Sequence, residues 1–186
     1  MQSELVVRAQ HGDREAFSSL ARGANARLYA TARLILRRPE LAEDAVQDTL
    51  ITAWRDIRGL RDPDRLDAWL HRLLVRACHR QLRQEGRRRG TELGLEADLA
   101  AARIADESRS IADRDEIERA FRRLTAEQRT ILALVYYADL PLADVAAALG
   151  IPIGTAKSRL HRSTDALRAA LAADQRSLPL PNGQIA

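Results

Sequence analysis

The segment LPLADVAAALGIPIGTAKSRLHRSTDALRAAL, residues 140–171, decides the fold of the C-terminal half of this chain. Its apolar spacing predicts a short helix over 142–149, followed by the tight turn Gly150-Ile151-Pro152. A second helix is expected to begin at Gly154 or Thr155. Two helices joined by a short glycine-containing turn form the helix-turn-helix pattern, whose second helix enters the major groove of DNA.

The second helix of this segment has two distinct faces when its residues are placed at about 100° intervals. The face expected in the core carries Ala156, Leu160, Leu167 and Leu171, and another face carries Lys157, Ser158, His161 and Arg162. The polar face can donate to guanine edges and phosphates, and Thr155 lies at the helix N-terminus, where backbone N–H groups attract phosphate. The alternative is a helical hairpin with a solvated polar face. The turn, the spacing and the basic face together favour DNA binding.

The stretch DAWLHRLLVRACHRQLRQEGRRR, residues 67–89, predicts a long helix from near Asp67 to about Glu85, with a ridge of arginines. On a helical wheel the ridge spans an arc of about 80° and consists of Arg72, Arg76, Arg80, Arg83 and Arg87. A separate apolar arc consists of Leu70, Leu73, Leu74 and Ala77. Such a ridge suits a phosphate backbone, and an aromatic side chain beside it, here Trp69, can stack on an unpaired base. A solvated face is the alternative for the arginines, and a core position is the better explanation for Trp69 alone.

A third helix, expected over 39–57 in PELAEDAVQDTLITAWRDI, combines an apolar side with an acidic and amide face. That face includes Asp44, Gln47 and Asp48. Carboxylates repel DNA, so the face suits a basic protein surface. Composition alone favours a merely solvated face.

Composition favours an all-α protein. The 186 residues include only 9 glycines and 6 prolines, so few of the residues that form tight turns between strands are present. The net charge is +6 over 1–90, −5 over 91–116 and +3 over 117–186. Two basic blocks that flank an acidic segment indicate two contacts with polyanions, joined by a spacer.

This pattern predicts two small helical domains, over 1–86 and 113–173, joined by a flexible acidic linker over 87–112. A disordered tail is expected over 174–186. The domains should move independently unless they pack on each other or a partner holds them. Local signals for helix ends are caps at Ser3, Asp13 and Thr125 (with Gln128), Pro39 in a first turn, and glycines after Glu85.

No motif for catalysis, metal or cofactor occurs, so neither a metal nor another cofactor is expected. The four histidines, His11, His71, His79 and His161, do not combine with cysteine or carboxylates at zinc spacing. The single Cys78 excludes an intramolecular disulfide and fits a reducing cytoplasm. No apolar run reaches 18 residues, so no membrane span is expected.

Together the motifs resemble the extracytoplasmic-function sigma factors of RNA polymerase, over about residues 4–85 and 113–171. DAVQDTL, 44–50, is similar to region 2.2, which implies that Asp44, Gln47 and Asp48 bind the clamp helices of the largest polymerase subunit. GTAKSRLHR, 154–162, is similar to region 4.2, which implies that the −35 element is bound by Thr155, Lys157, Ser158, Arg159, His161 and Arg162.

AWL, 68–70, and the basic helix after it resemble regions 2.3 and 2.4, which open and read the −10 element. The preceding loop falls where the family captures a flipped base. The implied −10 residues are Arg58, Arg61, Arg65, Trp69, Arg72, Arg76, Arg80 and Arg83. Arg76 and Arg80 stand where many members carry Asn and Asp, so the resemblance does not fix the −10 sequence preference.

The resemblance implies a cytoplasmic transcription initiation factor that is not an enzyme, with core RNA polymerase, promoter DNA and an anti-sigma factor as partners. The main alternative is a standalone helix-turn-helix regulator with an N-terminal sensing or dimerisation domain. That alternative explains 114–171 equally well, but it leaves the arginine ridge and the acidic face without a role. An enzyme is the least supported class.

Overall fold

The computed structural model of the chain describes residues 1–92 and 117–175. Within these ranges every regular element is a helix and no strand occurs, which confirms the all-α prediction. Most of the predicted linker and of the predicted tail lies outside the described residues.

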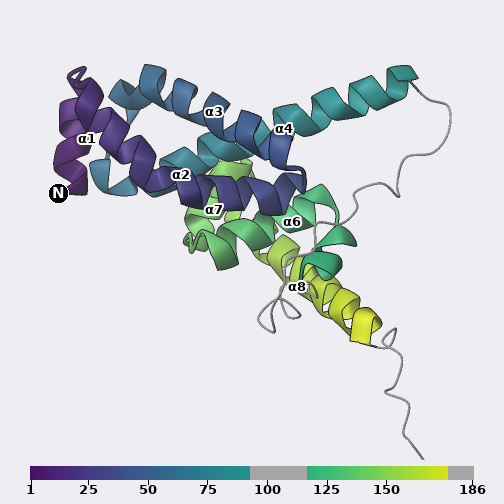
Figure 1. Ribbon diagram of the computed structural model, residues 1–186. Helices are drawn as coiled ribbons and strands as arrows, with labels where there is room; N and C mark the ends of the chain where they lie inside the picture. Colours follow the sequence, from purple (N-terminus) through teal and green to yellow (C-terminus); the bar gives the residue numbers. More distant parts are fainter. Residues whose placement is uncertain (93–116, 176–186) are drawn as a thin grey trace, which may run out of the picture.

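The N-terminal helices form a bundle around one apolar core (Figure 1). Its elements are α1 (Gln2–Gln10), α2 (Arg14–Leu36), α3 (Pro39–Asp56), the 3-10 turns η1 (Ile57–Gly59) and η2 (Pro63–Arg65), and α4 (Leu66–Glu92). Leu28, Ile35 and Leu74 are among its fully buried side chains. The far end of α4 extends beyond the bundle in Figure 1.

The C-terminal helices surround a second apolar core. They are α6 (Ala126–Leu132), the π-helix η3 (Ala133–Tyr137), α7 (Leu142–Leu149) and α8 (Ile153–Gln175), and residues 117–122 are also helical. Gly150 ends α7 with a φ of 66°, a left-handed conformation that favours glycine. Helices α7 and α8 and the turn between them confirm the predicted helix-turn-helix.

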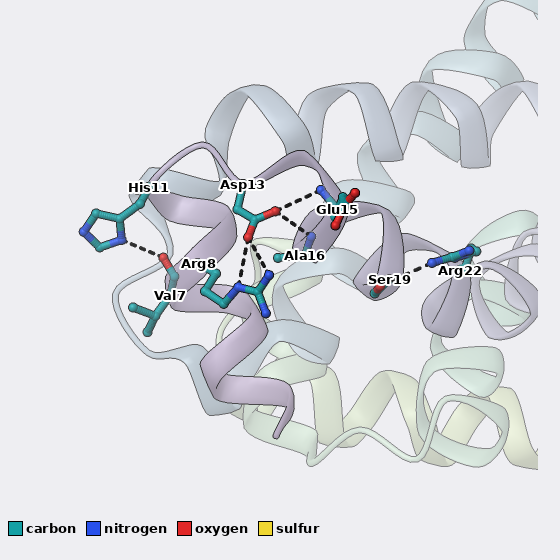
Figure 2. Close-up of polar contacts among 8 residues, drawn as sticks. All are labelled: Val7, Arg8, His11, Asp13, Glu15, Ala16, Ser19 and Arg22. Carbon is teal, nitrogen blue, oxygen red and sulfur yellow. Dashed lines mark hydrogen bonds and ion pairs between the residues drawn. The ribbon is translucent and has the colours of Figure 1, made fainter.

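Several helix ends follow the local sequence signals. The Asp13 carboxylate accepts hydrogen bonds from the backbone N–H groups of Glu15 and Ala16, each at 3.0 Å (Figure 2). These bonds, with an ion pair to Arg8 at 2.7 Å, lower the pKa of Asp13. Figure 2 shows how this carboxylate joins the end of α1 to the start of α2. The Thr125 and Gln128 capping box also forms as predicted.

Two local expectations were wrong. Ser3 does not cap α1, which begins at Gln2; its hydroxyl donates instead to Asp64. Gly86 does not interrupt α4, which continues to Glu92, since a glycine inside a helix costs only about 1 kcal/mol relative to alanine. The helix expected over 126–137 forms over its whole length, with α geometry to Leu132 and π geometry from Ala133 onward.

The two bundles pack against each other through α4 and α7 and through α2 and α6. Val75 of α4 is 2% exposed and belongs to the C-terminal core, while Ala133 of η3 is 1% exposed and belongs to the N-terminal core. Each core therefore contains a residue of the other bundle. Independent movement was expected only if the two domains did not pack on each other. They do pack on each other, so the bundles form one body in this structure.

Polar links reinforce this packing. The Arg129 guanidinium of α6 is buried and donates from Nε to the Ile35 carbonyl at 2.9 Å and from Nη1 to the Leu124 carbonyl at 2.6 Å. Ile35 lies in the last turn of α2, where carbonyl groups have no partner within the helix. Burial, with Arg37 nearby, lowers the pKa of Arg129 to about 10, so it stays charged at neutral pH. Arg65 and Asp144 form a second link, an ion pair between the bundles.

Arg129→Met tests the buried link, because it keeps an apolar stem but removes every donor. We expect the free energy of unfolding to fall by about 2–4 kcal/mol, since two carbonyls lose a charge-assisted hydrogen bond. Urea denaturation measures the loss. Arg122→Met, at an exposed position of the same bundle, is the matched control and should change little. Equal stability of the two variants would show that the Arg129 link contributes nothing.

Candidate nucleic-acid interface

The polar face of α8 is open to solvent. Lys157, Ser158, His161 and Arg162 are all exposed, while Ala156 on the opposite side is fully buried. The Arg162 Nε lies 3.4 Å from the Ser158 carbonyl oxygen, so this side chain folds back along its own helix. Of the other residues expected on the core side, Leu160 and Leu167 are half-buried against the C-terminal core, and Leu171 is half-buried.

The other two residues of this motif are less open. Thr155 is half-buried at the start of α8. Arg159 retains 28% of its side-chain exposure and forms an ion pair with Glu127 of α6, with Nη1 and Oε2 3.4 Å apart. In this structure Arg159 therefore joins α8 to α6 and does not lie on the open face with Arg162.

The arginine ridge of α4 is mostly open. Arg76, Arg80 and Arg83 are exposed, whereas Arg72 is half-buried and its Nε is buried without a hydrogen-bond partner. Arg80 also pairs with Asp48 of α3 across 3.3 Å. The exposed part of the ridge thus begins one turn later than the sequence pattern predicted.

The loop between α3 and α4 presents Arg58, Arg61 and Arg65 on its surface, and all three are exposed. The Arg58 Nε donates to the Gln10 carbonyl of α1 at 3.2 Å. Arg65 is held by Asp144 of α7. Two of the three loop arginines are therefore tied to neighbouring helices.

Trp69 is 8% exposed and belongs to the N-terminal core. It lines a small internal cavity with Phe17, Leu20 and Ile57. The ring is thus not available to stack on a base in this structure, which agrees with the core interpretation and removes Trp69 from the exposed residues beside the ridge.

The acidic face of α3 is present as predicted. Asp44 and Gln47 are exposed, and Asp48 is partly exposed beside Arg80. Ala45 and Val46, between them in sequence, are buried in the N-terminal core. The three polar side chains therefore lie on the outward face of α3, and the opposite face of this helix packs in the N-terminal core.

Burial shifts the pKa of three groups on α4. Burial lowers the pKa of His71, whose Nδ1 lies 2.8 Å from the Asp67 carbonyl oxygen, and it also lowers the pKa of His79. Burial raises the pKa of the Cys78 thiol to about 12. Across 1–92 and 117–175, no cluster of three His, Cys, Asp or Glu residues suits a metal ion. No described helix is long and apolar enough to cross a membrane.

Sequence reasoning missed four residues that organise these surfaces: Gln10, Glu127, Arg129 and Asp144. Each has a partner in a distant segment, at a separation in sequence that helical periodicity does not report. One is an amide and three are charged, and such residues are common on exposed helix surfaces. Their residue types therefore did not indicate a role between segments.

A helix-turn-helix with an open basic face, packed beside a bundle with an arginine ridge, defines a DNA-binding protein of the transcription-factor class. Sigma-70 region 2 matches residues 21–88, and Sigma-70 region 4 matches residues 114–167. The chain belongs to the extracytoplasmic-function (ECF) RNA polymerase sigma factors.

Named relatives agree with this assignment. The ECF RNA polymerase sigma factor SigM of Mycobacterium tuberculosis is 35% identical over 161 residues, which cover 87% of this chain and 80% of that protein. The RNA polymerase sigma-H factor of Pseudomonas aeruginosa is 28% identical, with 90% and 92% covered. The sigma factor RpoE of Bartonella quintana, solved with the anti-sigma factor NepR, is 28% identical with a TM-score of 0.68 and coverage of 84% and 98%.

As a member of this family, the chain is a transcription initiation factor that binds core RNA polymerase and directs it to promoter DNA.

Proposed function

We propose that α8 reads the −35 element, while α4 and the loop between α3 and α4 open and hold the −10 element. The observation that carries this division is the separation of two exposed basic surfaces on two different bundles. In the −35 contact, Lys157, Ser158, His161 and Arg162 face the groove, and the α8 N-terminus with Thr155 meets a phosphate. Arg159 joins them once it leaves Glu127.

In the −10 contact, Arg76, Arg80 and Arg83 track the phosphate backbone, and Arg58 and Arg61 meet the unpaired strand. Arg65 becomes free when α7 moves away, because it pairs with that helix in the closed body. Arg72, half-buried at the start of the ridge, joins these arginines. Asp44, Gln47 and Asp48 dock on the clamp helices of the largest polymerase subunit. This assignment makes 1–86 the region 2 domain, 113–173 the region 4 domain, 87–112 the linker and 174–186 a tail.

The two bundles have to separate for this mechanism. The −35 and −10 elements lie about 25 base pairs apart, which is roughly 85 Å at about 3.4 Å per base pair. A body held together by Val75 and by the Arg65–Asp144 pair cannot reach both elements at once. Docking on the polymerase therefore includes the opening of this interface.

The protein itself catalyses nothing in this proposal, and RNA synthesis belongs to the polymerase with which it acts in the cytoplasm. An anti-sigma factor is a further proposed partner, supported by the likeness to a sigma factor solved in complex with one. Such a partner would keep the sigma factor from the polymerase.

Run-off transcription with core polymerase on genomic fragments tests the proposed function. Specific transcripts should appear only when this protein is added, and the protein alone should bind promoter duplex weakly. Strong, sequence-specific binding of duplex by the protein alone, without any transcript from the mixture, would instead indicate a standalone regulator.

Arg162→Ala tests the −35 contact. We expect it to weaken promoter binding by the holoenzyme by about 1–3 kcal/mol and to relax selectivity, which is the worth of a bidentate contact to guanine. Arg168→Ala is the matched control, because Arg168 lies two turns later on α8 and pairs with Asp165. Binding assays on promoters with single −35 changes measure both effects. Equal losses for the two variants would remove α8 from the groove.

The double change Arg76→Ala, Arg80→Ala tests the ridge. Transcription from duplex promoters should fall, and a template already mismatched across the −10 region should recover part of the loss. The salt dependence of binding should flatten by about one unit for each lost phosphate contact. Arg14→Ala, Arg22→Ala removes the same charge from an exposed part of α2 and serves as the control. If the ridge variant opens duplex promoters as well as wild type, by permanganate probing, the ridge has no melting role.

A further inference from the structure

The loop between α3 and α4 consists of two single 3-10 turns, η1 and η2, joined by residues 60–62. Its internal hydrogen bonds include Leu60 N–H to the Ile57 carbonyl, Arg65 N–H to the Asp62 carbonyl, and Asp64 N–H to the Asp62 side chain. The side chains of Ile57 and Leu60 are buried, at 2% and 7% exposure. Single turns of this kind are short, so contacts from outside the loop add to its order.

Helix α1 supplies such contacts at its C-terminal end through Gln10. The Gln10 Nε2 donates to the Leu60 carbonyl at 2.7 Å and to the Ile57 carbonyl at 3.1 Å. The two hydrogens of one amide thus bind two loop carbonyls three residues apart. In return, the Arg58 Nε donates to the Gln10 main-chain carbonyl at 3.2 Å. Side chain and main chain of one residue therefore hold the first half of the loop.

The N-terminal end of α1 holds the second half of the loop. The Ser3 hydroxyl donates to an Asp64 carboxylate oxygen at 2.5 Å. Ser3 and Gln10 are seven residues apart, which is about 10 Å along a helix. Helix α1 therefore spans the loop and binds it at both ends.

Helix α1 is itself fixed, so it can act as a rigid support. Val6 and Ala9 are buried in the N-terminal core at 0% and 2% exposure. The Arg8–Asp13 pair and the cap that Asp13 forms on α2 lock the corner between the two helices (Figure 2). Movement of Gln10 is thereby restricted from two sides.

We propose that Gln10 is a positioning residue for −10 recognition: it fixes the loop backbone at Ile57 and Leu60, so that Arg58 and Arg61 meet the unpaired strand in a preset orientation. The inference rests on the −10 role proposed above for this loop. A loop ordered before binding does not lose conformational entropy when the strand arrives. Gln10 contacts only protein and acts through the loop arginines.

The test uses full-length protein with Gln10→Met, which preserves length but removes both donors, and Gln2→Met, an exposed position on the same helix, as the matched control. Hydrogen exchange in the free protein measures how well the backbone amides of the loop are protected. Gln10→Met should speed exchange at the amides of 57–61 and leave α2 and α4 unchanged. Ser3→Ala, a second and milder variant, should speed exchange at 62–65 instead.

Transcription by the holoenzyme reports the function. Gln10→Met should lower activity by roughly tenfold, the effect of two lost neutral hydrogen bonds. The loss should persist on a template mismatched across the −10 region, because the loop acts on the strand after it has separated. Duplex binding at the −35 element should not change. The Arg76, Arg80 variant, by contrast, should recover on that template.

The outcomes separate the positioning role of Gln10 from the −10 role of the loop. Unchanged exchange at 57–61 in Gln10→Met overturns the positioning role, whatever the transcription result. Faster exchange with full activity on both templates shows that Gln10 positions a loop that does not read the −10 strand, and so overturns both. Should Gln10→Met fail to fold, Ser3→Ala carries the test. Faster amide exchange at 62–65 with reduced transcription from the mismatched template supports the role of α1 in holding the loop. Faster exchange with unchanged transcription contradicts it.

Discussion

Helix α4 has to bury apolar side chains on two sides while it keeps its arginines in solvent, and the arrangement of the whole chain depends on this. Leu74 and Val75 are neighbours in sequence and point about 100° apart around the helix. Leu74 is fully buried in the N-terminal core, and Val75, 2% exposed, belongs to the C-terminal core. The surface that we propose faces DNA is what remains outside these two stripes, chiefly the exposed Arg76, Arg80 and Arg83.

This double burial, together with the links between the bundles, holds the chain closed in the structure. Burial of a valine contributes about 1.5–3 kcal/mol. The Arg65–Asp144 pair is largely exposed on the arginine side, so it is worth about 0–1 kcal/mol. Specific protein–DNA binding supplies about 11–15 kcal/mol. The proposed opening of the interface on the promoter would draw on this binding free energy.

Local chemistry accounts for what could be predicted from the sequence. The helix-turn-helix follows from a turn built on Gly150, and the Asp13 and Thr125 caps follow from residue type and spacing within four positions. The two faces of α8 follow from helical periodicity. Each of these features depends on residues that are close in sequence, so no knowledge of packing was needed.

The remaining features depend on packing between distant segments. Arg129 meets Ile35 across 94 positions, Arg65 meets Asp144 across 79, and Gln10 meets Leu60 across 50. Trp69 has the spacing of a ridge residue but lies in the N-terminal core, where it lines a pocket with Phe17 of α2 and Ile57. Ser3 has the residue type of a cap but binds Asp64 instead.

The most direct test of this account is the distance between the two bundles, measured by pulsed electron paramagnetic resonance with labels at Arg22→Cys and Ala169→Cys. The native Cys78 thiol is fully buried and its pKa is raised to about 12, so it does not compete for the label. The free protein should give one short distance. The promoter-bound holoenzyme should give a distance longer by tens of Å, toward the roughly 85 Å between the two elements. The same short distance in both states would contradict the account.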